Sequence, residues 1–383
     1  MRDWLIVGGG LHGSHIARRL QAACPQAAVA VIDPAASALA AWRRRADACG
    51  MRFLRSSQAH HLGLKTAALR IHARENGYGR EHSLGRYLRP SRALFEDHAR
   101  TVAAPVDRIA THVEALEPVN GGWRIHAADG RRRQARNVVL APGPAAPAQP
   151  HWGRQLPHLF DDDFAAHCAG RAATERIVVI GGGLTGVQYA LDRADAGHEV
   201  TVIAPHRPRF AAFDSDPCNA GPACLVPFRL LPIEQRPQAL ERARNPGTVP
   251  ADIHARLTAQ LARGAIRWQQ GMVRSLGERG PQLADGRTIT ADEVILATGF
   301  QPRVHELIER TAQRLELPLV TPALTRIDAD LAWAPGLYVA GGPASLQLGA
   351  MAGNIRGAQL AGKRLARVAG AAERLSPASA ALP

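Results

Sequence analysis

The chain has 383 residues, of which 46% are hydrophobic, so it is long enough for two or three domains with cores of their own. The formal net charge of +14 comes almost wholly from arginine, and the basic clusters at 43–45 and 131–133 are short and lack interleaved aromatic residues, so we expect no nucleic-acid partner. No apolar run reaches the ~18 residues of a membrane span and no signal-peptide pattern opens the chain, so we expect a cytoplasmic protein without a membrane partner.

The first predicted elements are a short buried strand, a glycine-rich turn and a helix. Residues 4–7 are apolar, the turn reads GGGLHG at 8–13, and the helix is predicted from about 14 to 23. A second strand, 28–32, follows and ends on Asp33.

The same order of elements returns in the middle of the chain. An apolar strand at 177–180 leads into GGGLTG at 181–186, a helix is predicted to about 196, and a further strand covers 199–203. Such a repeat indicates two copies of one supersecondary unit.

Each copy is followed by a predicted hairpin and by a strand that ends in glycine. The hairpin turns are Asp-Gly pairs at 129–130 and 285–286. The proline-rich segment 141–153 is predicted to link the copies, and the proline-rich segment 205–250 to be a loop-and-helix insertion in the second. We therefore predict an α/β protein with two Rossmann-like dinucleotide-binding domains.

The spacing of the glycines gives each turn its chemical meaning. In G-x-G-x-x-G between a strand and a helix, the first glycine permits the tight turn, the second lets the backbone approach a pyrophosphate, and the third lets the helix pack on the strand. The helix N-terminus then favours the phosphate charge. The predicted cofactor-binding glycines are Gly8, Gly10 and Gly13 in the first turn and Gly181, Gly183 and Gly186 in the second.

The two copies differ about twenty residues after the turn. In the first copy, Asp33 stands where a carboxylate accepts hydrogen bonds from a ribose 2′-hydroxyl, which suits FAD or NAD. In the second copy there is no acid, and Arg207 and Arg209 follow the strand. Arginine pairs with a 2′-phosphate that a carboxylate would repel, so the second site is predicted to prefer NADPH. The alternative is that these two arginines are ordinary surface residues.

The order of the motifs resembles that of the flavoproteins with two dinucleotide-binding domains. Glycine turn, VVLAPGP, glycine turn, EVILATGF and GLYVAGG follow one another from residue 4 to about 368. Within these flavoproteins the chain looks most like the class B flavin monooxygenases and the lysine and ornithine N-hydroxylases, because 297–300 is similar to their Ala-Thr-Gly-Tyr motif.

The resemblance implies a domain division and further cofactor contacts. Residues 1–160 and 292–383 would form an FAD domain, with the NADPH domain, 161–291, inserted between them. Thr298 and Gly299 belong to the Ala-Thr-Gly motif, and the strand and glycine turn from Gly336 onward would close the FAD site. The glycines of that turn are Gly341 and Gly342, and a helix is expected from near Ala350.

The family layout also places FLRSSQAHHLGLK, residues 53–65, near the flavin ring. Arg55, Ser56, His60 and His61 are candidates for contact with flavin or substrate, and we assign Arg55 and His60 catalytic roles, with His60 as a proton shuttle. The alternative is that paired histidines in a polar loop are exposed and inert.

Two dinucleotides on one chain indicate hydride transfer from nicotinamide to flavin. We expect an FAD-dependent NADPH oxidoreductase, and the resemblance implies a monooxygenase that acts on a small amine or other soft nucleophile through a flavin hydroperoxide. The alternatives are an NADPH-dependent flavin reductase or electron-transfer enzyme without oxygenation, and an FAD-binding redox sensor without turnover. The expected partners are a small-molecule substrate and O2.

The cysteines and histidines favour no further chemistry. Disulfide reduction needs two thiols close to the flavin, and Cys218 and Cys224, separated by five residues, are the nearest pair. We predict that this pair is not a redox motif. The histidine pairs lack the carboxylate or cysteine companions of a closed site, so no metal is expected.

Overall fold

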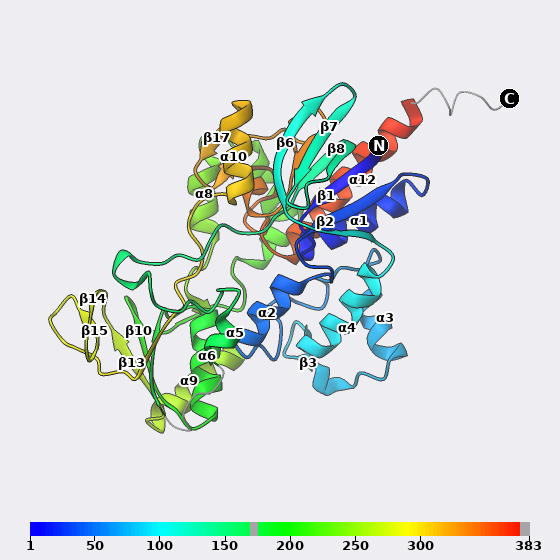
Figure 1. The fold of residues 1–383 in the computed structure, drawn as a ribbon. Helices are drawn as coiled ribbons and strands as arrows, with labels where there is room; N and C mark the ends of the chain where they lie inside the picture. Colours follow the sequence, from blue (N-terminus) through cyan, green and yellow to red (C-terminus); the bar gives the residue numbers. More distant parts are fainter. Residues whose placement is uncertain (169–174, 376–383) are drawn as a thin grey trace.

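The computed structural model describes residues 1–168 and 175–375 (Figure 1). Its larger sheet has eight strands and places the first glycine turn at its carboxyl edge. β20, β8, β1, β2 and β5 run parallel in that spatial order, β19 pairs antiparallel with β20 at one edge, and β6 and β7 extend β8 as an antiparallel meander. The strands are β1 (Arg2–Val7), β2 (Val29–Asp33), β5 (Asp107–Ala110), β6 (Val113–Val119), β7 (Gly122–Ala127), β8 (Arg132–Leu140), β19 (Ala332–Ala334) and β20 (Leu337–Val339).

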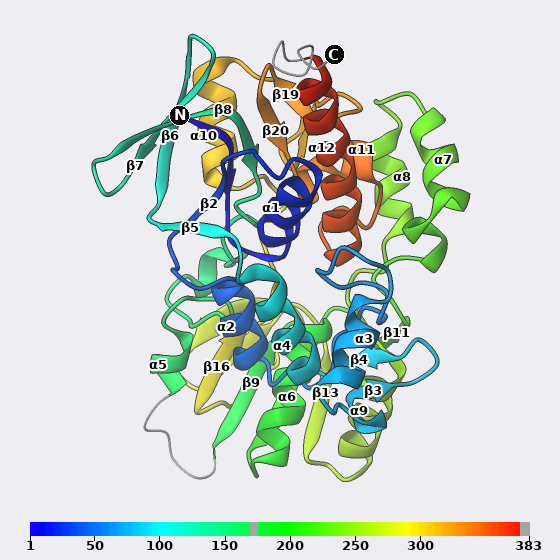
Figure 2. The same ribbon diagram turned by 90° about the vertical axis from the view of Figure 1, so that its right-hand side faces the viewer.

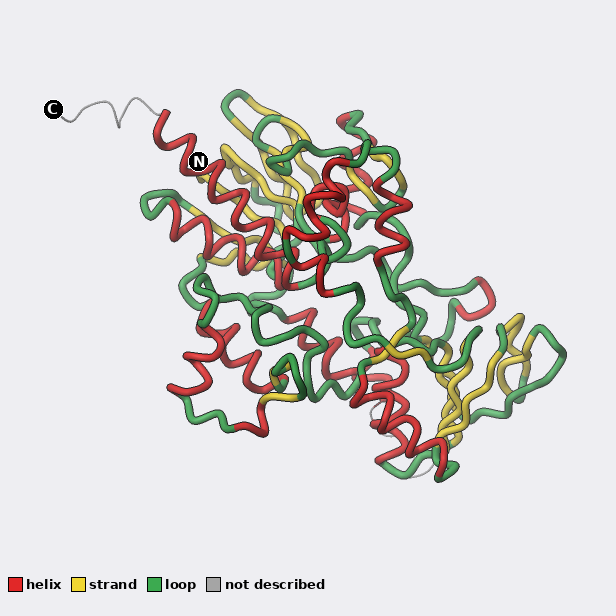
Figure 3. Tube along the Cα trace, turned by 180° about the vertical axis from the view of Figure 1, so that it is seen from behind, coloured by secondary structure: helices red, strands yellow, loops and turns green. Residues whose placement is uncertain are grey.

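Two helices cover one face of this sheet and bury its apolar side chains. α1 (Leu11–Ala23) and α12 (Ile355–Leu375) lie side by side (Figure 3). Ile6, Ile16 and Leu365 are fully buried in the core between helices and sheet. The first helix begins at Leu11, earlier than the predicted Ser14, because the N–H of Ser14 already bonds to the carbonyl of Gly10.

The smaller sheet has four parallel strands and holds the second glycine turn. Its order is β13 (Ile266–Gln270), β10 (Glu199–Ala204), β9 (Arg176–Ile180) and β16 (Glu293–Leu296). α6 (Leu184–Asp195) and α9 (Ala251–Ala262) pack against it. β16 pairs with β9 in this sheet, whereas the boundary expected at residue 292 assigns it to the first domain. We therefore propose that the chain returns to the first domain after Leu296.

The segment between β10 and α9 is the predicted insertion, and it contains two helices. Its elements are β11 (Arg209–Phe210), η3 (Pro217–Ala220), α7 (Pro222–Leu230), α8 (Arg236–Ala243) and β12 (Thr248–Val249). α7 and α8 lie beside α11 (Ser345–Leu348) of the first domain (Figure 2). The helix expected from Ala350 begins instead at Ile355, after α11 and a turn.

The remaining elements connect or border the two sheets. They are η2 (His151–Gly153), α2 (Ala40–Ala48), α3 (Ala68–Glu75), η1 (Arg80–His82), β3 (Ser83–Leu84), β4 (Arg89–Pro90), α4 (Arg92–Ala103), α5 (Phe164–Cys168), β14 (Val273–Gly277), β15 (Gly280–Leu283), α10 (Glu306–Leu315), β17 (Leu319–Thr321), β18 (Leu324–Thr325) and η4 (Gly342–Ala344). The predicted turn at Asp285-Gly286 is present. The chain after it pairs with β15 through the single antiparallel bridge between Gln282 and Thr288 and does not form a full second strand. Among the described helices, none is long and apolar enough to span a membrane.

Candidate dinucleotide sites

The first glycine turn is packed so tightly that two of its glycines have no room for a side chain. Gly8 has a φ of +106°, and a methyl group there would lie 2.1 Å from the carbonyl oxygen of Ala141. A methyl group on Gly13 would lie 1.7 Å from the carbonyl oxygen of Gly8. Gly10 has open space around it, on the side where a ligand could approach. This division of roles matches the roles expected from the spacing.

Asp33 holds the first turn from the end of β2. One carboxylate oxygen accepts a hydrogen bond from the N–H of Gly9 at 2.6 Å, and the other accepts from the N–H of Ala35 at 2.9 Å. An ionised carboxylate has about four acceptor positions, so Asp33 keeps capacity for a ribose hydroxyl.

Arg108 on β5 faces the same turn, and the sequence did not single it out. Its Nε donates to the carbonyl of Ala36 at 3.1 Å, but both terminal nitrogens are buried and have no hydrogen-bond partner among the residues that the structure describes. One of them lies 2.0 Å from the position that a methyl group on Gly9 would take. Burial lowers the pKa of this guanidinium, and the nearby Asp33 opposes that shift. Buried, unsatisfied donors beside a glycine turn fit the oxygens of a dinucleotide.

A cavity of about 260 Å³ opens beside the end of β2. Leu39, Trp42 and Phe95 give it apolar walls, and Arg43, Arg100 and Arg108 line it with positive charge. A flat aromatic base with a ribose at its edge needs this combination of surfaces, so the cavity fits the adenosine end of FAD.

The second glycine turn has the same backbone geometry. A methyl group on Gly186 would lie 2.1 Å from the carbonyl oxygen of Gly181, and one on Gly181 would lie 2.4 Å from that of Ala297. Gly183, like Gly10, has no close neighbour, since its nearest atom is the α-carbon of Gly247 at 3.9 Å.

The strand registers show how the two sites differ. Asp33 is the last residue of β2, and Ala204 is the last residue of β10. The strands next to these are β5 beside β2 and β13 beside β10. Arg108 on β5 pairs with Val31, two residues before the end of β2, and Trp268 on β13 pairs with Val202, two residues before the end of β10. The second site thus carries a methyl and an indole where the first carries a carboxylate and a guanidinium.

Arg207 and Arg209 follow β10 and are exposed to solvent. Within residues 1–168 and 175–375, neither side chain has a hydrogen bond or an ion pair, so both guanidinium groups are free to meet an anion. Their assignment to a 2′-phosphate stays a prediction.

The pyridine nucleotide-disulphide oxidoreductase family matches residues 2–218, which is more than half of the chain. The chain belongs to this family. The resemblance to two-dinucleotide-binding-domain flavoproteins and the predicted fold class are confirmed, as is the expectation of FAD and a pyridine nucleotide as cofactors.

Solved structures of similar fold cover nearly the whole chain. Ornithine hydroxylase from Pseudomonas aeruginosa matches with a TM-score of 0.77 at 19% identity, covering 97% of this chain and 99% of that one. Ornithine N-hydroxylase from Kutzneria sp. 744, solved with reduced FAD, NADP+ and L-ornithine, matches with a TM-score of 0.77 at 17% identity, covering 97% and 100%. Identities this low show a shared fold.

A curated relative matches part of the chain. The nitric oxide reductase FlRd-NAD(+) reductase of Vibrio vulnificus (strain CMCP6) is 28% identical over 183 residues. The match covers 45% of this chain and 39% of that protein.

In this oxidoreductase, Arg55 connects the first domain to the insertion. Its guanidinium donates to the carbonyl of Ala211 at 2.9 Å, to the hydroxyl of Thr248 at 2.7 Å and to the carbonyl of Thr248 at 3.2 Å. With these bonds Arg55 positions the insertion against the first domain. Its catalytic role stays a prediction.

Replacing Arg55 by glutamine is expected to destabilise the oxidoreductase by about 1–3 kcal/mol, because partly buried backbone acceptors lose a charged donor. Thermal unfolding measures the loss, with Arg52→Gln as control, since Arg52 makes an exposed ion pair with Asp195 across the same two domains. A variant with unchanged stability and normal flavin reduction but no turnover would assign Arg55 to catalysis instead.

His60 and His61 are adjacent in sequence but have different surroundings. His61 is buried, its Nδ1 accepts from the N–H of Gly63 and its Nε2 lies 3.0 Å from the carbonyl of Thr66, so it is a structural residue. His60 is half-buried among charged groups of other segments. Burial, and then the positive charge of Arg356, lower its pKa to about 4, with Asp214 opposing the shift. At neutral pH His60 is therefore uncharged, and its shuttle role stays a prediction. Ser56 is half-buried in the same loop.

Two other predicted contacts lie where the chain crosses between domains. The hydroxyl of Thr298 donates to the carbonyl of Ala148, and the carbonyl of Gly299 accepts from the N–H of Ala148 at 2.9 Å. Gly341 and Gly342 follow β20 at the carboxyl edge of the larger sheet, and a methyl group on Gly342 would meet no atom within 4 Å. Cofactor contact by these four residues stays a prediction.

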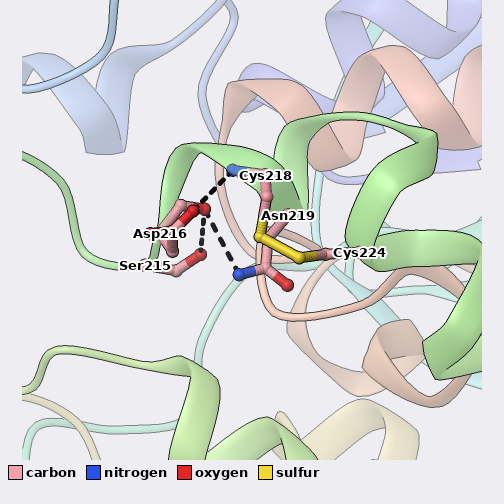
Figure 4. The surroundings of a disulfide bond; sticks show 5 residues. All are labelled: Ser215, Asp216, Cys218, Asn219 and Cys224. Carbon is pink, nitrogen blue, oxygen red and sulfur yellow. Dashed lines mark hydrogen bonds between the residues drawn. A yellow bond between two sulfur atoms is a disulfide. The ribbon is translucent and has the colours of Figure 1, made fainter.

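Cys218 and Cys224 form a disulfide at the start of α7 (Figure 4). The carboxylate of Asp216 accepts from the N–H of Cys218 at 2.8 Å, and the side chain of Asn219 donates to the carbonyl of Asp216. The sequence predicted no redox role for this pair and did not foresee the bond. In the part of the chain that the structure describes, no group of three or more histidine, cysteine or acidic residues could hold a metal ion.

Several histidines are buried in the first domain and are held uncharged. Burial lowers the pKa of His15 to about 4 and that of His98 to about 3; the guanidinium of Arg19 adds to the shift of His15, and the imidazoles of His61 and His72 add to that of His98. The Nδ1 of His15 lies 2.8 Å from the carbonyl oxygen of Leu62, and within the described part of the chain the Nε2 of His15 and the Nδ1 of His98 are buried without hydrogen-bond partners.

The oxidoreductase is therefore expected to lose stability as the pH falls below 6.5. In the unfolded chain both imidazoles take up a proton near pH 6.5, whereas in the folded chain His15 does so near pH 4 and His98 near pH 3. Between these values, each histidine lowers the free energy of unfolding by up to about 1.4 kcal/mol for each unit by which the pH falls. Thermal unfolding of wild type and His98→Leu between pH 7 and 5 measures this, and the variant should show the shallower slope. Equal slopes would contradict the assignment.

Proposed function

We propose that this chain is an FAD-dependent NADPH oxidoreductase. The observation that carries the proposal is the pair of glycine turns with equal backbones and unlike surroundings. The first has Asp33 and Arg108 beside a cavity with apolar and charged walls, which suits FAD. The second has no acid and has Arg207 and Arg209 exposed beside it, which suits a 2′-phosphate.

In the proposed reaction the protein binds and orients two dinucleotides. The bound cofactors supply hydride transfer from nicotinamide to flavin. Gly10 and Gly183 leave the pyrophosphates room to approach the backbone, and Arg108 offers them or the ribose its free donors. Uncharged His60 can accept a hydrogen bond from a bound substrate, while its pKa of about 4 makes it a weak proton acceptor at neutral pH.

We further propose that the electrons pass to oxygen and that a small amine or other soft nucleophile is oxygenated. The support is the full-length likeness in fold to two ornithine hydroxylases. Exclusion of water and placement of the cofactors would be the main contribution of the protein.

The ratio of hydrogen peroxide formed to NADPH consumed tests this proposal. With a panel of small primary amines, a true substrate should lower the ratio well below one and yield a hydroxylated product that carries oxygen from labelled O2. A ratio of one with every amine in the panel would count against oxygenation.

A second function, electron transfer to a protein or other acceptor without oxygenation, has its own support. The Vibrio vulnificus relative is named as a nitric oxide reductase FlRd-NAD(+) reductase, and the family is named for disulphide chemistry. Rapid NADPH-dependent reduction of a dye acceptor, together with stoichiometric peroxide in air, would favour this function over the first.

A further inference from the structure

A groove between α7 and α12 is lined by positive side chains. It has a volume of about 240 Å³. Figure 2 shows that α7 and α8 of the insertion lie on the same side of the first domain as α11 and α12. The cationic lining residues of the groove are Arg229, Arg356, Lys363, Arg364 and Arg367. No residue of either glycine turn lines it. Its lining residue Arg356 also acts electrostatically on His60, so the groove begins beside the predicted substrate loop and lies apart from both glycine turns.

Three of the four arginines of the groove are held in place by neutral acceptors. Arg364 donates to the carbonyls of Ala329 and Gln347, both at 2.8 Å, and Arg356 donates to the carbonyl of Ala220 at 2.6 Å. Arg229 donates to the carbonyl of Gln347 at 3.3 Å. Fixed guanidinium groups lose little further freedom when they bind a ligand.

Negative charge is scarce around these groups. Across residues 1–168 and 175–375, none of the five cations makes an ion pair with a carboxylate. Asp330 is the carboxylate that stabilises the charge of Arg364, while the like charges of Arg229 and Arg367 destabilise it. Burial and these neighbours lower the pKa of Arg364 to about 10. Bringing like charges together in a half-buried groove is unfavourable unless an anion joins them.

The other walls of the groove are apolar. Pro222, Leu225, Val226 and Leu360 line it. The loop that leads into α7 is closed by the Cys218–Cys224 disulfide and carries Ala220, whose carbonyl is bound by Arg356 (Figure 4). Val226 keeps 51% of its surface exposed, so apolar area is available to a ligand.

We propose that this groove binds a small organic anion that carries a short apolar group. The charged end would meet the guanidinium groups of α12, and the apolar end would cover Leu225 and Val226. A recessed volume of about 240 Å³ suits a ligand of a few carbon atoms. The cations line a hollow and not a projecting ridge or a long track, which disfavours a membrane surface or a nucleic acid.

Titration calorimetry on the purified full chain tests the proposal with hexyl phosphate and hexanoate, and with 1-hexanol as the uncharged probe. At least one anion is expected to bind with one-site stoichiometry and at least tenfold more tightly than 1-hexanol, and the comparison of the two anions shows whether the site prefers phosphate or carboxylate. Saturating NADP+ should leave this binding unchanged.

Two variants locate the site. Lys363 and Arg367 are exposed and carry no hydrogen bond in the described chain, so the double variant Lys363→Gln/Arg367→Gln should fold normally. Its affinity for the anion should be about tenfold lower than that of the wild type, because charge-assisted contacts are lost. Arg131→Gln/Arg132→Gln removes the same charge from the turn between β7 and β8, on the opposite edge in Figure 2, and should bind as wild type does.

Three results would each overturn the proposal: no binding of either anion, equal weakening in both double variants, or displacement by NADP+. The last would place the probe at the second glycine turn. None of these measurements depends on turnover, so the proposed oxidoreductase function stands or falls separately.

Discussion

Replacing Gly13 by alanine is expected to destabilise the first domain by about 3 kcal/mol and to leave the purified protein without FAD. The new methyl group would lie 1.7 Å from the carbonyl oxygen of Gly8 and 2.9 Å from its carbonyl carbon, and both are backbone atoms that no rotamer change can move. Overpacking of this kind forces α1 away from β1. Thermal unfolding and the visible absorbance of the purified protein measure the two effects.

Gly10→Ala in the same turn is the matched control. Gly10 has a φ of −76° and no atom within 4 Å of the added methyl, so this variant should unfold near the wild-type temperature. It should nevertheless bind FAD more weakly, because the methyl occupies space that we assign to the pyrophosphate. Wild-type FAD content in Gly10→Ala would contradict that assignment, and wild-type stability in Gly13→Ala would contradict the packing.

The second large effect is expected at Arg207 and Arg209. Replacing both by glutamine should weaken the binding of NADPH by about 10- to 100-fold, because charged hydrogen bonds to a 2′-phosphate are worth about 1.5–3 kcal/mol. The binding of NADH, which lacks this phosphate, should be nearly unchanged. Both side chains are exposed, so the fold should be preserved. Steady-state kinetics with each nucleotide gives the ratio of kcat/KM values.

Arg274→Gln/Arg279→Gln controls for the loss of charge, since both residues are exposed on the hairpin of β14 and β15 in the same part of the chain. The control should keep the wild-type preference. If both double variants lose NADPH affinity equally, the effect is the net charge and not a contact. If neither does, the two arginines are ordinary surface residues.

The sequence predicts the parts of the fold that local patterns specify. The two strand–turn–helix units are found within a few residues of their expected positions, because glycine spacing and apolar runs act over short distances. The first helix begins three residues earlier than predicted, since capping by the turn itself extends it. The boundary expected at residue 292 falls just before β16, whereas β16 pairs with β9 of the smaller sheet; local sequence does not specify such a boundary, because strand pairing depends on contacts between distant residues.

The candidate sites depend more on tertiary contacts, so less of them is visible in the sequence. Arg108 and Trp268 occupy matching register positions over the two turns, and nothing in their local sequence marks them. Arg55 lies in the predicted loop, but its donors reach Ala211 and Thr248, more than 150 residues away. Arg108 could have been predicted from its position on β5, the third parallel strand of the unit that contains the first glycine turn.

We propose that electrons pass from a nucleotide at the second turn to a flavin at the first. Anaerobic mixing of the purified protein with NADPH tests it most directly, with the visible flavin absorbance as the signal. We expect a yellow protein that NADPH bleaches faster than NADH does, and a Gly183→Ala variant that stays yellow but bleaches slowly. A colourless protein that takes up no FAD, or a yellow one that neither nucleotide bleaches, would contradict the claim.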